Sequence, residues 1–190
     1  MSFDTLPTFA LAFYCVTLAA QRLILSRRRV RAAVDLDRGS YRLFDVTGAL
    51  SIPAAVVLSF TDYGRVAAGE PYVAAAGLAL LVAGTAFRWA SIITLWEYFT
   101  PDVSILEGQR VVRSGLYGVV RHPSYAGLLL RYLGFGLALA NWLSAALVFL
   151  PLLCATVYRI RVEEAALRAH FGEEYDSYAS ATKRLVPGIY

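Results

Sequence analysis

The chain has 190 residues, of which 58% are hydrophobic, and a formal net charge of +4. Its mean hydropathy of +0.54 is higher than a soluble domain of this size can usually accommodate, so the composition excludes an ordinary water-soluble protein and indicates a membrane protein. The two cysteines both lie within apolar segments and indicate neither a disulfide framework nor a metal site.

Five apolar segments along the chain predict membrane helices, because a bilayer crossing takes about 20 residues. They are residues 6–25, 43–60, 72–96, 125–140 and 142–160. The fourth segment is short for a full crossing, and only Asn141 and Trp142 lie at its boundary with the fifth, so we expect these two segments to form a tight helical hairpin. The sequence therefore predicts an all-α, polytopic membrane protein of about five transmembrane helices that forms a single domain over residues 1–190.

Arginines concentrate between the first two apolar segments. They are Arg22, Arg27, Arg28, Arg29, Arg31, Arg38 and Arg42. Because basic loops of membrane proteins stay in the cytoplasm, we expect this loop, residues 97–124 and residues 159–190 on the cytoplasmic side, and the N-terminus outside. Next to a membrane span such a cluster attracts anionic headgroups, so the expected partners are membrane lipids and not nucleic acid.

Four residues inside the apolar segments stand out. Gly77 and Gly84 would allow a neighbouring helix to approach closely. Arg88 and Arg131 carry charges that are costly at membrane depth unless they are paired or hydrated. We expect Arg131 to line a polar cavity, whereas Arg88 fits such a cavity and a side chain that extends to the headgroups equally well.

Residues 108–127 are too polar and glycine-rich to face lipid. Pro123 is predicted in the first turn of the fourth helix, where its missing N–H is not needed, and His122 then lies at the start of that helix. The free N–H groups of a helix start suit a carboxylate or a phosphate. Tyr117 and Tyr125 would add aromatic walls for a flat ring.

The last apolar segment continues as a polar helix that is expected to end at Gly172. Arg159 and Glu163 are four residues apart, as are Glu164 and Arg168, so each pair shares a helix face. The residues alone favour two intrahelical ion pairs. In the alternative, Glu163 faces a cationic ligand while Arg159 binds a substrate anion.

The order of these motifs is specific. They are Val112-x-x-Gly115-x-Tyr117, Arg121-His122-Pro123-Ser124-Tyr125-x-Gly127 and, after a helical hairpin, Arg159-x-x-x-Glu163-Glu164 and Phe171-Gly172-Glu173-Glu174-Tyr175. In this order they resemble the isoprenylcysteine carboxyl methyltransferase family, in particular its small prokaryotic integral membrane members, and are similar to the related phospholipid methyltransferases. The resemblance extends over about residues 97–184.

This resemblance implies transfer of a methyl group from S-adenosyl-L-methionine to a lipophilic acceptor that partitions into the membrane. The acceptor would be a small molecule or a lipid, for example the carboxylate of an isoprenylcysteine-like molecule, with no obligate protein partner. Residues 1–96 would supply three N-terminal spans, and residues 97–190 would form the cofactor-binding and catalytic half, with a cytoplasmic cofactor loop.

The resemblance also implies roles for individual residues. The cofactor would contact Gln109, Val111, Val112, Tyr117, His122, Pro123, Ser124, Tyr125 and Glu163, with Gln109 standing where the family commonly has a histidine. Arg159 would be catalytic by holding the carboxylate of the acceptor. Arg131 is a second candidate for acceptor binding, because of its charge inside an apolar segment and not because of the resemblance. Glu164 or His122 would act as a general base if the acceptor must lose a proton.

Two alternatives come from other functional classes. Membrane sterol-type reductases that use NADPH also carry a His-Pro-x-Tyr-type segment and a tyrosine-ended tail, which residues 185–190 resemble. A non-catalytic membrane protein that retains the architecture is the other alternative, and the intact set of polar motif residues argues against it.

Overall fold

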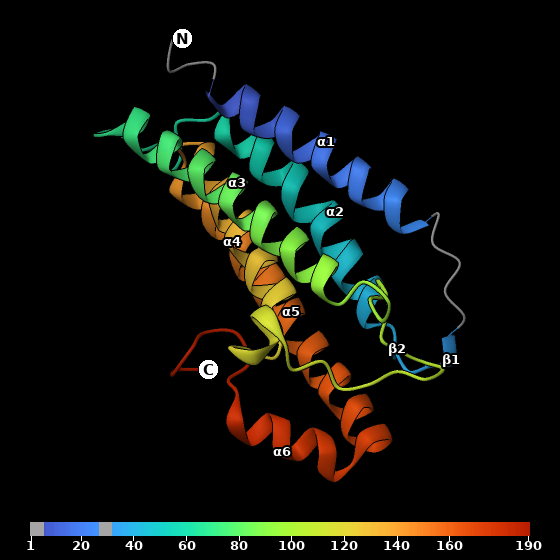
Figure 1. The fold of residues 1–190 in the computed structure, drawn as a ribbon. Helices are drawn as coiled ribbons and strands as arrows, with labels where there is room; N and C mark the ends of the chain where they lie inside the picture. The colour runs from blue at the N-terminus through green and yellow to red at the C-terminus, as the bar shows by residue number, and fades with distance from the viewer. Residues whose placement is uncertain (1–5, 27–31) are drawn as a thin grey trace.

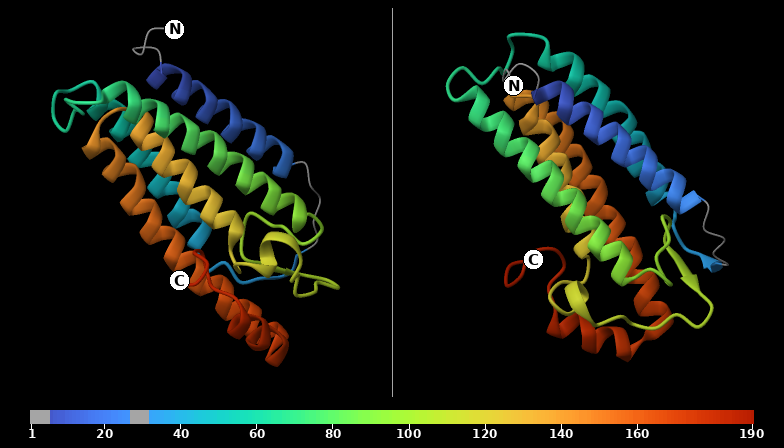
Figure 2. Two further views of the ribbon diagram at one scale, coloured as in Figure 1. Left: turned by 60° about the vertical axis from the view of Figure 1, so that its left-hand side comes forward. Right: turned by 45° about the horizontal axis from the view of Figure 1, so that its top comes forward.

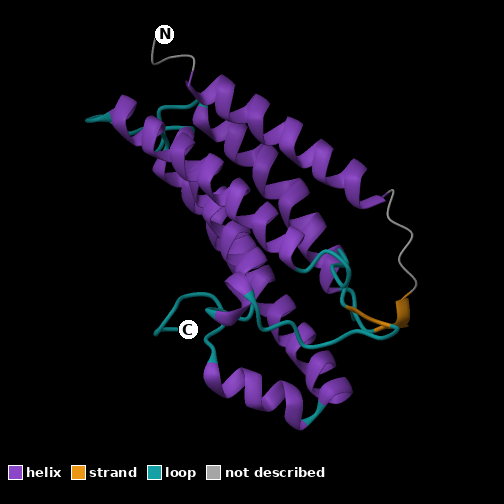
Figure 3. Ribbon diagram, viewed as in Figure 1, coloured by secondary structure: helices purple, strands orange, loops and turns teal. Residues whose placement is uncertain are grey.

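The structure is a computed structural model that describes residues 6–26 and 32–190. Its elements in chain order are α1 (Leu6–Ser26), β1 (Ala32–Asp35), α2 (Ser40–Ser59), α3 (Glu70–Thr94), β2 (Ser104–Leu106), the 3-10 helix η2 (Gly115–Gly118), α4 (Pro123–Ala138), α5 (Trp142–Phe171) and α6 (Glu173–Ala181). Figure 1 and Figure 3 show that long helices make up most of the fold. Arg27, Arg28, Arg29 and Arg31 of the predicted cytoplasmic loop lie outside the described residues.

The helices α1 to α5 match the five predicted apolar segments in order and position. Among the described residues, α1, α2, α3 and α5 are long and apolar enough to cross a bilayer. α4 has 16 residues and is therefore about 24 Å long, less than the roughly 30 Å of a hydrocarbon core. The predicted polytopic helical fold is confirmed, and the chain is an integral membrane protein with several spans.

The predicted hairpin between α4 and α5 is confirmed and is fixed by Asn141. The Asn141 side-chain oxygen accepts a hydrogen bond from the Ser144 N–H at 2.9 Å, which caps the start of α5. Its amide nitrogen donates to the carbonyl oxygen of Tyr63 at 2.7 Å. One side chain therefore joins this hairpin to the connection between α2 and α3.

Glycines allow α3 and α4 to pack against each other at backbone distance, as the sequence predicts for Gly77 and Gly84. A Cβ atom added at Gly77 would lie 2.6 Å from the Leu137 carbonyl carbon and closer still to the Ala138 nitrogen. At Gly84, an added Cβ would overlap the backbone of Arg131. This contact fixes the position of α4, whose first turns form the wall of the cavity described below.

Replacing Gly77 with leucine is expected to lower the free energy of unfolding by about 1–3 kcal/mol, because the side chain would separate α3 from α4. Thermal unfolding in detergent measures this loss. Gly48→Ala is the matched control, since an added Cβ there meets only side-chain atoms at 3.8 Å and should leave stability unchanged or slightly raised. Equal melting temperatures for the two variants would contradict the close α3–α4 contact.

A short antiparallel sheet of β1 and β2 was not predicted. Ala32 pairs with Leu106 and Asp35 pairs with Ser104. Strands of four and three residues are too short to produce a recognisable alternation of polar and apolar side chains. The sheet joins the connection between α1 and α2 to the segment that follows α3, so residues far apart in the sequence meet at one end of the bundle.

α5 is the longest helix, with 30 residues, and it extends beyond the other long helices toward α6 (Figure 2). α4 begins at Pro123 and α5 ends before Gly172, as the sequence predicts. The polar part of α5 therefore lies at the same end of the bundle as the two strands and the segment that precedes α4 (Figure 1).

Candidate active site

A cavity of about 800 Å³ lies between the helices at this end of the bundle. Apolar side chains of α1 and α2, such as Leu18, Phe44 and Ile52, line one part of it. Polar side chains from α4, α5 and the segment before α4 line another part, and they include Tyr125 and Glu163. A single cavity with an apolar and a polar part suits an amphiphilic ligand.

Tyr125 connects the two charged residues of α5 that face the cavity. Its hydroxyl group donates to Glu163 Oε2 at 2.7 Å and accepts a hydrogen bond from Arg159 Nε at 2.8 Å. Arg159 and Glu163 therefore interact through the hydroxyl of Tyr125, and the simpler prediction of a direct intrahelical pair between them was wrong. The prediction for the second pair is confirmed, since Arg168 Nη1 lies 3.5 Å from Glu164 Oε2.

Arg159 is almost fully enclosed by polar partners. Its Nη1 donates to Asp37 Oδ1 at 3.0 Å and to Ser40 Oγ at 3.2 Å, and its Nη2 donates to the carbonyl oxygen of Pro101. Together with the bond to Tyr125, these contacts balance the charge of the guanidinium and fix its orientation.

Asp37 belongs to the site although the sequence analysis assigned it no role there. Burial by itself would raise the pKa of the Asp37 carboxyl group, but hydrogen bonds from the Tyr41 N–H, the Ser40 hydroxyl and the Val103 N–H, together with the charge of Arg159, outweigh burial and lower the pKa below its ordinary value. The carboxylate therefore stays charged at neutral pH and remains a counter-ion for Arg159.

Glu164 occupies a different environment from its neighbour Glu163. Its side chain is only 1% exposed and accepts hydrogen bonds from Arg121 Nε at 3.1 Å and from Arg184 Nε at 3.0 Å. His122 Nε2 lies 3.4 Å from Glu164 Oε1. Glu164 does not line the cavity, so the expectation that it acts as a general base is corrected: a carboxylate held by several guanidinium groups is a weak proton acceptor.

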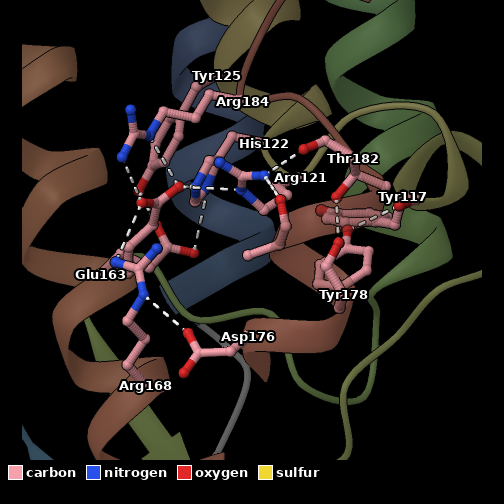
Figure 4. Close-up of polar contacts among 12 residues, drawn as sticks. Tyr117, Arg121, His122, Tyr125, Glu163, Arg168, Asp176, Tyr178, Thr182 and Arg184 are labelled. Carbon is pink, nitrogen blue, oxygen red and sulfur yellow. Dashed lines mark hydrogen bonds and ion pairs between the residues drawn. The ribbon is translucent and has the colours of Figure 1, made fainter. Parts of the chain in front are cut away.

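The C-terminal segment covers the start of α4. The N–H groups of Arg121 and His122 donate to the carbonyl oxygens of Lys183 and Arg184 at 2.7 and 3.0 Å. The Arg121 side chain also donates to the carbonyl oxygen of Thr182 (Figure 4). These contacts fix the backbone at the histidine that begins α4.

The predicted site residues divide into two groups. Those on the cavity wall are Gln109, Tyr117, His122, Ser124, Tyr125, Arg131, Arg159 and Glu163. The others, Val111, Val112, Pro123 and Glu164, do not line the cavity. The chain leaves the cavity wall after Gln109 and returns to it at Tyr117, while Pro123 is buried as the first residue of α4. The expected cofactor contacts of Val111, Val112 and Pro123 therefore find no support in this arrangement.

The cavity also has polar residues to which the sequence analysis gave no role. Tyr14 and Gln21 of α1 lie on its wall, together with Arg88, for which the sequence left two interpretations open. Arg88 is 8% exposed and donates from Nε to Gln21 Oε1 at 3.1 Å. The cavity interpretation of Arg88 is therefore confirmed, and extension to the headgroups is wrong.

Comparisons with known proteins agree with these observations. The model of the isoprenylcysteine carboxyl methyltransferase family matches residues 77–169. The chain is 33% identical over 120 residues to a probable protein-S-isoprenylcysteine O-methyltransferase of Oryza sativa subsp. indica, covering 62% of this chain and 63% of that protein. It is 32% identical over 114 residues to the protein-S-isoprenylcysteine O-methyltransferase of Schizosaccharomyces pombe, covering 59% of this chain and 48% of that protein. The chain thus spans less than two thirds of the length of these relatives.

A solved structure has a similar fold. It is that of the eukaryotic intramembrane Ras methyltransferase ICMT, with a TM-score of 0.59 and 22% sequence identity, and the similarity covers 78% of this chain and 53% of that one. The region matched by the family model contains the start of α4 and also Arg159 and Glu163 of α5, which lie on the polar wall of the cavity. The ordered motifs and the matched region make residues 77–169 of the chain similar to the isoprenylcysteine carboxyl methyltransferase family, and the solved structure shows a similar fold.

Proposed function

We propose that the chain is a methyltransferase that moves a methyl group from S-adenosylmethionine to the carboxylate of a lipophilic, isoprenylcysteine-like acceptor. The observation that carries this proposal is the single cavity, in which polar residues of α4 and α5 meet apolar side chains of α1 and α2. The relatives are named as protein-S-isoprenylcysteine O-methyltransferases, which supports the same reaction and makes a prenylated protein a further acceptor to test.

The residues on the polar wall fit the cofactor. Glu163 is 29% exposed, so part of its carboxylate remains available to the cationic end of the cofactor. Among the described residues, the Ser124 N–H at the start of α4 donates to no backbone or side-chain oxygen, and it suits the carboxylate of the cofactor. Tyr117 and Tyr125 supply aromatic surface, and Gln109 and His122 complete the set of contacts.

The chain has mainly to orient and enclose the reactants. When bound, S-adenosylmethionine supplies a methyl group that is already activated by a sulfonium. Arg159, fixed by Asp37, holds Tyr125 and through it Glu163 at the polar end of the cavity. A carboxylate acceptor is already deprotonated, so no general base is required. The apolar walls exclude water, and alignment of the reactants then supplies much of the rate enhancement.

Transfer of a labelled methyl group to N-acetyl-S-farnesylcysteine by the detergent-purified protein tests this function. The expected product is a methyl ester that releases its label in base, and the farnesylcysteine amide should accept none. Label on a thiol or phenol acceptor with none on the carboxylate would refute the acceptor class. No transfer to any of these acceptors would refute the methyltransferase assignment.

We also propose that the cavity end of the bundle faces the cytoplasm and that the N-terminus lies outside. Arg22 belongs to the last turns of α1, and Arg38 and Arg42 flank the start of α2. These two helix ends lie at the cavity end of the bundle, as does α6 (Figure 1). With both natural cysteines replaced by serine, a cysteine at Glu173 should react with an impermeant thiol reagent only in inside-out vesicles. A cysteine at Asp62 should react only in right-side-out vesicles, and the reverse pattern would contradict the topology.

A further inference from the structure

Two arginines on the cavity wall have no carboxylate counter-ion among the described residues. Arg131 is 1% exposed and Arg88 is 8% exposed. Within residues 6–26 and 32–190, neither guanidinium forms an ion pair with a carboxylate. Their shared polar partner is the Oε1 atom of Gln21, at 3.1 Å from Arg88 Nε and 3.5 Å from Arg131 Nη1. Two buried like charges that share one neutral amide are a costly arrangement in an otherwise apolar region.

Neighbouring side chains hold Arg131 in place, but its hydrogen-bond donors are not all used. Its guanidinium carbon lies 5.4 Å from the ring centre of Tyr14 and 5.2 Å from that of Tyr132, so aromatic rings stabilise and orient the cation. Among the residues that the structure describes, its Nε atom has no hydrogen-bond partner, and neither does the hydroxyl oxygen of Tyr14. All three side chains line the cavity. The site therefore offers N–H and O–H donors and excess positive charge, which together suit an anion.

Arg159 is unlike this pair. Its charge is balanced by Asp37, and it also donates to Ser40, Pro101 and Tyr125. Arg88, by contrast, donates from Nη1 to the carbonyl oxygen of Ser124 at 3.0 Å, so it lies against the first turn of α4 next to the proposed cofactor site. An anion between Arg88 and Arg131 would thus lie where the polar and the apolar parts of the cavity meet.

We infer that Arg131, with Arg88 and Gln21, forms an anion-binding site that receives the acidic group of the lipophilic acceptor and selects anionic over neutral acceptors. This inference rests on the proposed function and adds to it a residue that determines acceptor specificity. The sequence-based assignment of the acceptor carboxylate to Arg159 then changes, and Arg159 becomes a positioning residue for Tyr125 and Glu163. The phosphate of a membrane phospholipid also carries anionic oxygen atoms. The test must therefore distinguish the acceptor carboxylate from a lipid headgroup.

The test measures binding and not turnover, so its outcome is separate from that of the methyl-transfer assay. N-acetyl-S-farnesylcysteine and its neutral amide are titrated into the 190-residue protein in nanodiscs of phosphatidylcholine. The wild type is expected to bind the carboxylate at least tenfold more tightly than the amide. Arg131→Gln should lose this preference, and Arg131→Lys, which keeps the charge without the planar fork, should retain part of it.

Two controls distinguish a specific loss of anion binding from a general loss of folding. Arg65→Gln removes an arginine outside the cavity that pairs with Glu70, and it should keep the full preference for the carboxylate. Affinity for S-adenosylhomocysteine should stay within twofold of wild type in Arg131→Gln, since the contacts of Arg131 are with Gln21, Tyr14 and Tyr132 and not with the proposed cofactor residues. An equal carboxylate preference in wild type and Arg131→Gln would overturn the inference. The inference would also be overturned if the wild type bound the carboxylate and the amide equally well and bound phosphatidylglycerol in a way that depends on Arg131. That result would assign the site to a lipid headgroup.

Discussion

Replacement of Glu164 by alanine is expected to lower the free energy of unfolding by about 3–5 kcal/mol, a large part of the stability of a protein this size. The carboxylate is buried between Arg121 and Arg184, and its removal leaves these guanidinium groups without their shared counter-ion. Chemical or thermal unfolding in detergent measures the loss. Glu164→Gln should lie between alanine and wild type, because the amide keeps the volume and one acceptor oxygen.

Glu174 provides the matched control for this substitution. It also faces an arginine, Arg113, but at 3.8 Å and with its side chain 55% exposed. Surface pairs of this kind contribute about 0–1 kcal/mol. Similar unfolding free energies for Glu164→Ala and Glu174→Ala would contradict the role of Glu164 as the buried link between α5, the segment before α4 and the C-terminal segment.

Replacement of Glu163 by glutamine is expected to weaken binding of S-adenosylmethionine tenfold or more. The change keeps the shape of the side chain but removes the negative charge that faces the cavity, and a hydrogen bond to a charged group contributes about 1.5–3 kcal/mol. S-adenosylhomocysteine lacks the sulfonium charge, so its binding should weaken less. Calorimetry with both ligands measures the two effects.

The control for Glu163→Gln is Glu173→Gln at the exposed start of α6, which should bind both ligands as the wild type does. Unchanged affinity in Glu163→Gln would remove Glu163 from the proposed cofactor site. An equal loss for the two ligands would assign the contribution of Glu163 to the amino group, which both ligands carry, and not to the sulfonium.

The helical part of the fold could be predicted because each helix leaves a local signal. Apolar segments of about 20 residues indicate spans, and Pro123 and Gly172 mark a helix start and a helix end. Gly77 and Gly84 indicated close packing, although the sequence did not reveal that α4 is the partner. These features depend on residues that are near one another along the chain.

The parts that were not predicted depend on contacts between distant residues. Asp37 and Arg159 are 122 positions apart, and the bond between them exists only because the β1–β2 sheet and α5 meet at one end of the bundle. Asp37 and Ser40 just before an apolar segment are typical of a helix start, so the sequence could indicate a capping role but not a role in the site.

Adjacent residues of a helix can also have different roles. Glu163 and Glu164 point about 100° apart on α5, so one faces the cavity and the other faces the arginines of the segment before α4 and of the C-terminal segment. The motif alone could not separate them, because the sequence does not state which face of the helix is covered. Gln21 and Tyr14 were missed for a related reason, since their partner Arg131 lies on a helix more than one hundred residues away.

The central claim is that this protein uses S-adenosylmethionine. Calorimetric titration of S-adenosylhomocysteine into the detergent-purified protein tests it most directly, with NADPH titrated in parallel. The account predicts saturable binding of S-adenosylhomocysteine, weakened in Glu163→Gln, and no binding of NADPH. Binding of NADPH alone would contradict the account and support a sterol-type reductase, and binding of neither ligand would contradict it in favour of a non-catalytic membrane protein.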